Sequence, residues 1–403
     1  MKLACVVQRY GAGVAGGSER HCREIALRLA ATHEVTVLTT CAADYVTWEN
    51  EFPAGESVDG GAVVRRFPVR RPRRLKRFAD LSDEVFDGPT SDATQEEWFR
   101  ENGPDCPALL EHLRAEGNAY DLVLFWTFRY APSFFGIPIV RDRAVLLPTA
   151  EEDGAVDLSI LEEFFQMPAA YIFLTPEEQT LVSTRAGRAL EPSTVIGMGL
   201  DPALAATGTR LPAGVNPPYL LYLGRVDRNK GCDSLLEYFS DYVAAGLQTG
   251  LIDSSHDGLS LVLAGPAKMT IPSHPRIRAL GRVSDAEREA LLRGALALAI
   301  PSPFESLSIV LLEAWNHGVP ALVNGHCAVL KGQVRRANGG LYFRSSAEFT
   351  EALNTLRSAD ADRRALGAQG LAYVEREYRW PTVMARVEAL LEQARARRRD
   401  AQS

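Results

Sequence analysis

Two glutamates stand at a spacing that suits sugar-nucleotide chemistry. Glu305 and Glu313 are eight positions apart in IPSPFESLSIVLLEAWNHGVPALV, where we expect a strand to end at Ile300 and an amphipathic helix to begin near Ser306. Eight helical residues span roughly 12 Å, which is about the reach from a sugar ring across a diphosphate to a ribose. Glu305 could accept hydrogen bonds from sugar hydroxyls and Glu313 from ribose hydroxyls.

The start of the same helix offers a place for the phosphates. There the backbone N–H groups of Leu307 and Ser308 would face an anion. The alternative interpretation is structural, with Glu313 an ordinary acid on a helix surface and Glu305 a partner of the helix dipole. Taken alone, the two glutamates would favour the structural interpretation.

Two basic residues follow another expected strand. In YLLYLGRVDRNKGCDSLL, Arg225 comes directly after Gly224, and Lys230 precedes Gly231 at the start of a helix. Ligands of doubly wound sheets bind at the carboxyl ends of the strands, so both cations could neutralise a leaving diphosphate. The alternative is that both side chains are simply solvated in a loop.

A glycine-rich loop follows the first expected strand. Gly11, Gly13 and Gly16 in GAGVAGGSER match G-x-G-x-x-G and precede a helix. Three residues separate the strand from Gly11, and the second strand ends without the carboxylate that binds an adenosine ribose. The loop therefore favours a phosphate or sugar over a dinucleotide, with a tight strand-to-helix turn as the structural alternative.

The elements that must position these residues alternate between short apolar runs and amphipathic stretches, which is typical of βα units and a parallel sheet. A segment rich in Gly, Pro, Ala and Thr separates two such series, and we place the boundary near Gly197. The late break at Trp380–Pro381 precedes a final helix that is long enough to return to the first domain. The expected strands are Leu3–Val7, Val35–Leu38, Leu122–Trp126, Ala144–Leu147 and Tyr171–Leu174, then Tyr219–Leu223, Leu259–Ala264 and Ala295–Ile300.

Composition limits the class of protein. The 403 residues are 46% hydrophobic and 24% charged, which suits two large globular domains. A net charge of −7 argues against a nucleic-acid binder. The six cysteines are scattered without a Cys-x-x-Cys pair, and no apolar run approaches the length of a membrane-spanning helix. We expect a cytoplasmic protein.

The basic stretch, which we define as residues 65–77, carries eight basic residues in thirteen and precedes an acid-rich segment. It could contact an anionic membrane at its inner face or a phosphorylated acceptor. The alternative is a solvated surface that its acidic neighbours compensate.

The three motifs together resemble the retaining family 4 glycosyltransferases, also called glycosyl transferases group 1, which have the GT-B fold. The resemblance rests on GVAGGSER, YLGRVDRNKG and PSPFESLSIVLLEAWNHGVPALV and spans almost the whole chain. It implies two Rossmann-like parallel-sheet domains of an α/β protein that face a cleft. Residues 1–196 would form the acceptor domain and 197–380 the donor domain, while 381–403 would return to the N-terminal domain.

The resemblance also implies roles for individual residues. The resemblance implies that the donor would be a UDP- or GDP-linked sugar and that neither a metal nor a cofactor would be needed. Arg225 and Lys230 would hold its diphosphate, Glu313 its ribose and Glu305 its sugar. The remaining contacts would come from Gly16 and Gly17 at the reaction centre, the backbone near Val283 at the base, and Ser306, Leu307 and Ser308 in the donor site.

Two positions depart from the family pattern. Ser306 stands where many members have glycine, which alters the fit around the sugar. Glu151, in PTAEEDGAVDL, stands where many members carry a histidine on the acceptor side. Glu151 could accept a proton or a hydrogen bond from an acceptor hydroxyl, or it could belong to a solvated acidic loop.

These observations favour a retaining transferase that moves a hexose-type sugar from a nucleoside diphosphate to a glycan, lipid-linked or secondary-metabolite acceptor. An NAD-dependent oxidoreductase is the first alternative, and the missing ribose-binding acid opposes it. A non-catalytic sugar-nucleotide-binding protein is the second. The intact set of Arg225, Lys230, Glu305 and Glu313 opposes that one.

Overall fold

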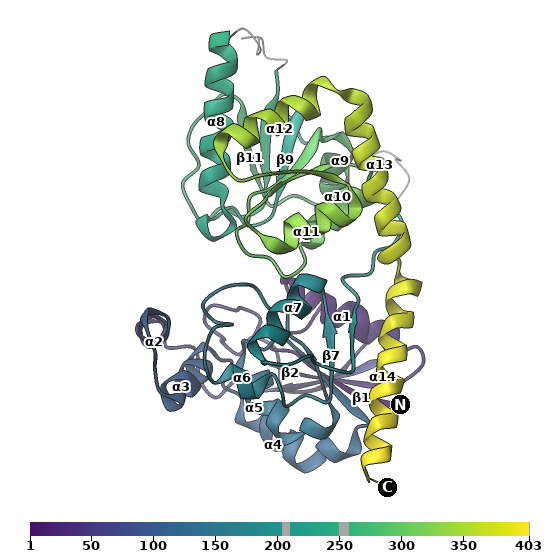
Figure 1. The fold of residues 1–403 in the computed structure, drawn as a ribbon. Coiled ribbons are helices and arrows are strands. Elements are labelled where there is room, and N and C mark those ends of the chain that lie inside the picture. Colours follow the sequence, from purple (N-terminus) through teal and green to yellow (C-terminus); the bar gives the residue numbers. More distant parts are fainter. Residues whose placement is uncertain (204–209, 250–257, 403) are drawn as a thin grey trace. The chain divides into compact units, whose positions relative to one another are not determined.

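The structure is a computed structural model that describes residues 1–203, 210–249 and 258–402. The chain divides into two compact units (Figure 1). Unit 1 contains residues 1–198 together with 383–403, and unit 2 contains residues 199–382.

Unit 1 is built on an eight-stranded sheet within the described part of the chain, in the order β3-β4-β2-β1-β5-β6-β7-β8. All neighbouring strands are parallel except β3, which pairs antiparallel with β4 at one edge. The strands are β1 (Lys2–Val6), β2 (Glu34–Thr40), β3 (Gly55–Asp59), β4 (Ala62–Phe67), β5 (Leu122–Trp126), β6 (Ala144–Leu147), β7 (Ala170–Phe173) and β8 (Ser193–Val195). The helices are α1 (Gly17–Leu29), α2 (Leu75–Asp87), α3 (Asp92–Asn102), α4 (Pro107–Glu116), α5 (Ala131–Gly136), α6 (Leu161–Phe164) and α7 (Pro176–Arg185).

Unit 2 is built on a parallel sheet that has six strands among the described residues, in the order β11-β10-β9-β12-β13-β14. The strands are β9 (Tyr219–Leu223), β10 (Ser260–Ala264), β11 (Ile277–Gly281), β12 (Ala297–Ile300), β13 (Ala321–Asn324) and β14 (Gly340–Phe343). The helices are α8 (Cys232–Thr249), α9 (Asp285–Gly294), α10 (Ile309–Asn316), α11 (Ala328–Ala337), α12 (Ser346–Ser358) and α13 (Asp360–Glu377).

Both sheets confirm the predicted α/β class of two Rossmann-like domains. Each expected strand is present, and its ends differ from the prediction by one or two residues at most. In each sheet the strand order reverses direction at the centre, between β1 and β5 in unit 1 and between β9 and β12 in unit 2. Such a reversal is where doubly wound sheets bind ligands, beyond the carboxyl ends of the strands.

The final helix, α14 (Trp380–Gln402), returns to unit 1 as expected, and runs along it in yellow in Figure 1. Its buried face carries Val383, Val387 and Leu391, each 0% exposed. Polar contacts reinforce this packing, because Glu388 pairs with His33 at 2.8 Å. The helix therefore forms part of the core of unit 1, although it is the last element of the chain.

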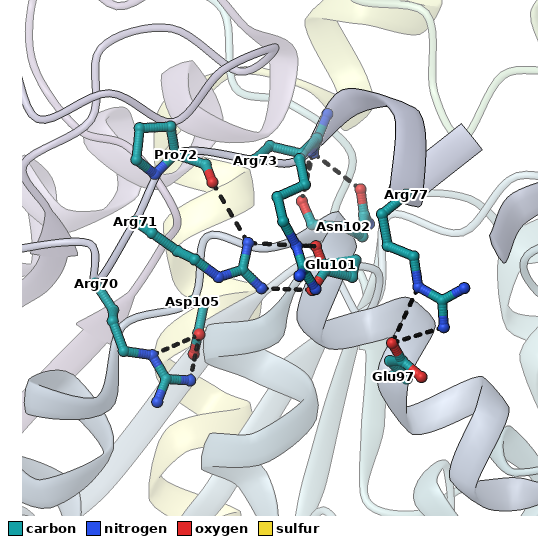
Figure 2. Close-up of polar contacts among 10 residues, drawn as sticks. Arg70, Arg71, Pro72, Arg73, Arg77, Glu97, Glu101, Asn102 and Asp105 are labelled. Atoms are coloured by element: carbon teal, nitrogen blue, oxygen red, sulfur yellow. Dashed lines mark hydrogen bonds and ion pairs between the residues drawn. The ribbon is translucent and has the colours of Figure 1, made fainter. Parts of the chain in front are cut away.

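Carboxylates compensate most of the basic stretch (Figure 2). The partners are Glu56 and Glu116 for Arg65, Asp105 for Arg70, Glu101 for Arg71 and Arg74, and Glu97 for Arg77. Arg73 differs, since it donates to the backbone carbonyl and the side chain of Asn102. These contacts support the interpretation of a surface compensated by acidic neighbours. Among the described residues, every helix is too short or too polar to cross a bilayer.

The packing of α14 gives a testable prediction for stability. Leu391→Ala should destabilise unit 1 by about 2–5 kcal/mol, because it removes buried apolar contacts and leaves a cavity. Guanidinium unfolding followed by circular dichroism measures the change. Gln393→Ala alters an exposed position of the same helix and serves as the control. Equal stability of the two variants would contradict the assignment of α14 to the core.

Candidate functional site

Lys230 and Glu305 meet at the centre of unit 2. They are 75 residues apart in the chain, yet Nζ of Lys230 lies 2.9 Å from Oε1 of Glu305. Lys230 lies in the loop after β9 and Glu305 in the loop after β12, the two strands at which the sheet order reverses. Both side chains are partly exposed, at 31% and 15%. The structure thus brings together two of the predicted site residues from separate motifs.

Gly231 makes this meeting possible. Its φ is +69°, in the left-handed region that favours glycine. A Cβ at this position would lie 2.3 Å from the carbonyl oxygen of Pro301, directly after β12. Only a residue without a side chain lets the loop after β9 approach the end of β12 this closely.

Asp227 organises the two basic residues, and the sequence analysis missed it. Its carboxylate accepts a hydrogen bond from Nε of Arg225 and another, of 3.0 Å, from the backbone N–H of Lys230. Asp227 is only 9% exposed and caps the short 3-10 turn that contains Lys230. The available signal was an aspartate three residues before Lys230, which is the usual position of a cap.

The helix after Glu305 starts later than predicted. We expected it to begin near Ser306, but α10 begins at Ile309, so the segment from Glu305 to Glu313 is helical only in its second half. Ser308 is the N-cap with a left-handed φ of 65°, which is uncommon for serine. Its hydroxyl is buried and has no hydrogen-bond partner among the described residues. Leu307 and Ser308 thus lie in the turn that precedes the helix.

Glu313 is held by Arg288, a residue that the sequence analysis did not identify. The guanidinium of Arg288 donates to both carboxylate oxygens, at 2.9 Å for Oε1. The side chain of Glu313 is 8% exposed, so it is not the ordinary surface acid of the alternative interpretation. Arg288 lies on α9, which Ser284 caps directly after Val283. The ion pair therefore ties the segment around Val283 to α10.

In unit 1 the glycine loop is fixed by a buried ion pair. Gly16 is the N-cap of α1, which begins at Gly17. A Cβ on Gly16 would lie 2.0 Å from Oε2 of Glu19. Glu19 is held by Nε of Arg9 and by Gln8, each at 2.9 Å. Gln8 and Arg9, two of the extra residues between β1 and Gly11, thus anchor the glycine loop.

Glu151 lies in the loop after β6, next to a buried carboxyl group. Glu178 is 1% exposed and accepts hydrogen bonds from the backbone N–H groups of Ala150 at 2.7 Å and Leu174 at 2.6 Å. Burial raises the pKa of Glu178 to about 8, the backbone hydrogen bonds oppose this shift, and the charge of Glu151 adds to it. Glu178 therefore fixes the backbone that presents Glu151. The neighbouring Asp153 pairs with Arg129 at 2.5 Å.

The predicted site residues fall into two groups. Arg225, Lys230, Val283, Ser306, Leu307, Ser308, Glu305 and Glu313 belong to unit 2, whereas Gly16, Gly17 and Glu151 belong to unit 1. In each unit they lie in loops that follow strands, except Gly17 at the start of α1 and Glu313 within α10.

Comparison with known proteins shows which families the chain resembles. Residues 217–358, which lie in unit 2, match the family described as Glycosyl transferases group 1. The chain is 24% identical over 354 residues to glycogen synthase of Mycobacterium tuberculosis (strain CDC 1551 / Oshkosh), which covers 80% of this chain and 78% of that protein. Together with the fold, these matches confirm the resemblance to the glycosyl transferases of group 1 and support a glycosyltransferase of the GT-B type.

Solved structures support the fold. Sucrose-phosphate synthase from Thermosynechococcus elongatus is similar with a TM-score of 0.70 and 16% identity, over 98% of this chain and 99% of that chain. The Anabaena protein Alr3699/HepE, in complex with UDP and glucose, is similar with a TM-score of 0.65 and 15% identity, over 98% of this chain and all of that chain. At these identities the likeness establishes the GT-B fold alone.

Glu178 gives a prediction for the pH dependence of stability. Its pKa rises from an ordinary 4.5 to about 8 on folding, so the folded protein holds this proton more tightly than the unfolded chain. The resulting stabilisation is fully present below pH 4.5 and is lost as the pH rises through about 8. Glu178→Gln cannot titrate and should lack this loss, as urea unfolding between pH 5 and about 9 would measure.

The control for this measurement is Glu177→Gln, which changes the preceding residue of the same helix. Its stability should follow that of the parent at every pH. If the free energies of unfolding of the parent and of Glu178→Gln differed by the same amount at every pH, the raised pKa of Glu178 would be contradicted.

Proposed function

We propose that the chain is a retaining glycosyltransferase that moves a hexose-type sugar from a nucleoside diphosphate sugar to an acceptor hydroxyl. The contact between Lys230 and Glu305 at the centre of the unit 2 sheet carries this proposal. A cation and a carboxylate that meet at this position suit a donor with a charged diphosphate and a hydroxylated sugar. The UDP and glucose in the complex of the Anabaena protein are consistent with such a donor.

In the proposed reaction the bond between the sugar and the diphosphate breaks, and negative charge grows on the leaving oxygen. Arg225 supplies a planar guanidinium and Lys230 a compact ammonium to stabilise this charge. Asp227 keeps both in place. Glu305 would accept hydrogen bonds from the sugar hydroxyls while it remains close to Lys230.

The turn before α10 would hold the rest of the donor. The buried hydroxyl of Ser308 is a donor that a phosphate oxygen could satisfy, and the start of α10 favours negative charge. Glu313 would accept hydrogen bonds from the ribose, with Arg288 holding its carboxylate. The backbone near Val283 would contact the base. Retention of configuration and independence from a metal follow from the family resemblance and are part of the proposal.

On the acceptor side we propose that Glu151 engages the acceptor hydroxyl. Gly16 and Gly17, from a separate loop of unit 1, would face the reaction centre. Cytoplasmic location also belongs to the proposal. Peripheral contact of the basic stretch with an anionic membrane is a separate hypothesis. The density of arginine supports it, and the ion pairs of these arginines oppose it.

The two cations give the direct test of function. Arg225→Ala and Lys230→Ala should each slow sugar transfer by about 100-fold or more, because each removes a charged stabiliser of the leaving group. Release of UDP or GDP from a panel of nucleotide sugars, with and without candidate acceptors, measures the rate. Arg228→Ala removes an exposed cation from the same turn and should retain activity within about threefold. Turnover near that of the parent in either test variant would refute the assignment.

A second test concerns Glu151. Glu151→Gln removes the charge at nearly constant size, so transfer to the acceptor should fall more than hydrolysis of the donor by water. The ratio of the two rates is measured from one reaction with a labelled donor. Glu152→Gln, at the next position, is the matched control. An unchanged ratio in Glu151→Gln would leave this residue without a part in the reaction.

A further inference from the structure

Unit 1 contains a pocket that is lined by none of the residues to which the proposed function assigns a role. Its volume is about 390 Å³, and it lies between the glycine loop and the hairpin of β3 and β4. Its walls include residues 10–14 of the loop, Phe52, and the hairpin residues Ser57, Asp59 and Arg66. This volume is at the lower end of the range for small-molecule sites, so the pocket suits one ligand of about monosaccharide size.

Arg66 is the cation of this pocket. It is partly buried, and its guanidinium lies over the ring of Phe52, with Cζ 4.9 Å from the ring centroid. Nη1 donates to Oγ of Ser57 at 3.1 Å and Nη2 to the carbonyl oxygen of Tyr10 at 2.8 Å. Both partners are neutral. The buried Nε–H of Arg66 has no hydrogen-bond acceptor within the described residues.

The one carboxylate in the walls is already engaged by another arginine. Asp59 accepts two hydrogen bonds from Arg23 on α1, at 2.7 and 3.0 Å. These bonds are the main reason why the pKa of Asp59 lies below its usual range, and Arg66 makes only a small contribution. Within the described part of the chain, the charge of Arg66 therefore lacks the carboxylate partner that Arg65, Arg70 and Arg77 have in the same basic stretch.

The pocket also contains a buried phenol. Tyr10 is 0% exposed, and its hydroxyl lies close enough to the carboxylate of Asp59 to interact with it. Burial is the main cause of the raised pKa of Tyr10, and the charges of Cys22 and Asp59 and the side-chain contact with Asp59 add to it. The hydroxyl therefore keeps its proton at neutral pH. With Ser57 it gives the site neutral hydroxyl groups beside the guanidinium.

We propose that this pocket binds the anionic oxygens, phosphate or carboxylate, of a small hydroxylated molecule, and that Arg66 is the residue that holds them. A guanidinium with free N–H donors forms paired hydrogen bonds to such groups, and a partly buried charge with neutral partners gains most from a counter-ion. The aromatic ring of Phe52 and the hydroxyl of Ser57 suit the remainder of a sugar-like ligand. The assignment of the pocket as an acceptor subsite rests on the proposed function. Its assignment as an anion site does not.

Hydrogen–deuterium exchange with glucose 6-phosphate, malate and glucose tests the proposal. Saturating UDP is added in a parallel series to occupy the proposed donor site. Glucose 6-phosphate or malate should slow exchange in peptides that cover residues 10–14 and 55–67, and glucose at the same concentration should not. Which of the two anions binds more tightly distinguishes a phosphate from a carboxylate. Protection by neither anion would overturn the proposal.

Variants separate the role of Arg66 from a general effect of charge. Arg66→Gln should weaken binding of the protecting anion by about tenfold or more, as expected for the loss of a charged hydrogen bond. Arg65→Gln changes the same charge on the adjacent position of β4, where the side chain pairs with Glu56 and Glu116, and should bind within about twofold of the parent. If Arg66→Gln does not fold, Arg66→Lys keeps the charge without the fork and should also bind more weakly than the parent.

The two proposals fail differently. Exchange slowed by UDP at residues 224–231 and 305–313, without protection of unit 1 by either anion, would leave the transferase standing and remove the anion site. Protection of unit 1 by an anion, without any effect of UDP on exchange, would support the anion site and count against the transferase. Parent-like binding by Arg66→Gln would overturn the role of Arg66 in either case.

Discussion

The approach of the loop after β9 to the end of β12 is the constraint on which the unit 2 site depends. Parallel strands deliver their following loops to one edge of the sheet, but they do not by themselves bring two loops into contact. Here the contact requires Gly231, because a side chain would collide with the carbonyl of Pro301. The consequence is that Lys230 reaches Glu305 from a loop 75 residues away.

Once the loops meet, buried carboxylates need partners, and arginines supply them. Glu313 is held by Arg288 in unit 2, and Glu19 is held by Arg9 in unit 1. A buried charge without a partner costs more than an ion pair contributes, so these pairs are best understood as fixing geometry. Arg288 orients the carboxylate proposed for the ribose. The pair in unit 1 shapes the turn at Gly16, where a Cβ would require the carboxylate of Glu19 to shift.

Most of the strands predicted from sequence are buried on both faces, although β13, which is buried in all but its last residue, was not among them. Central strands such as β5 and β9 are continuous apolar runs, and their residues are fully buried in the structure. The hairpin of β3 and β4 was missed because it lies at an edge, with Val58 73% exposed and two arginines in β4. For such strands the apolar signal is diluted by solvent-facing charge.

The sequence predicted the site residues that stand out by type and spacing. It did not predict which side chains pair with them in the fold. Arg225, Lys230, Glu305 and Glu313 stand out by spacing. Arg288 does not, because nothing local to DAEREALLRG distinguishes the arginine that meets Glu313 from the one five residues later. The late start of α10 was equally hidden, since the left-handed turn at Ser308 is imposed by the surrounding loop and not by a glycine.

The basic stretch shows how a charge pattern in sequence differs from a charged surface. Its density suggested one extended cationic patch. In the fold the acids of α3 and its flanks neutralise most of the arginines, and Glu101 alone accepts from two of them. Screening by salt and neighbours leaves such paired charges little long-range effect. What distinguishes Arg66 is therefore the neutral character of its partners, Ser57 and the Tyr10 carbonyl, and not the number of basic residues around it in the sequence.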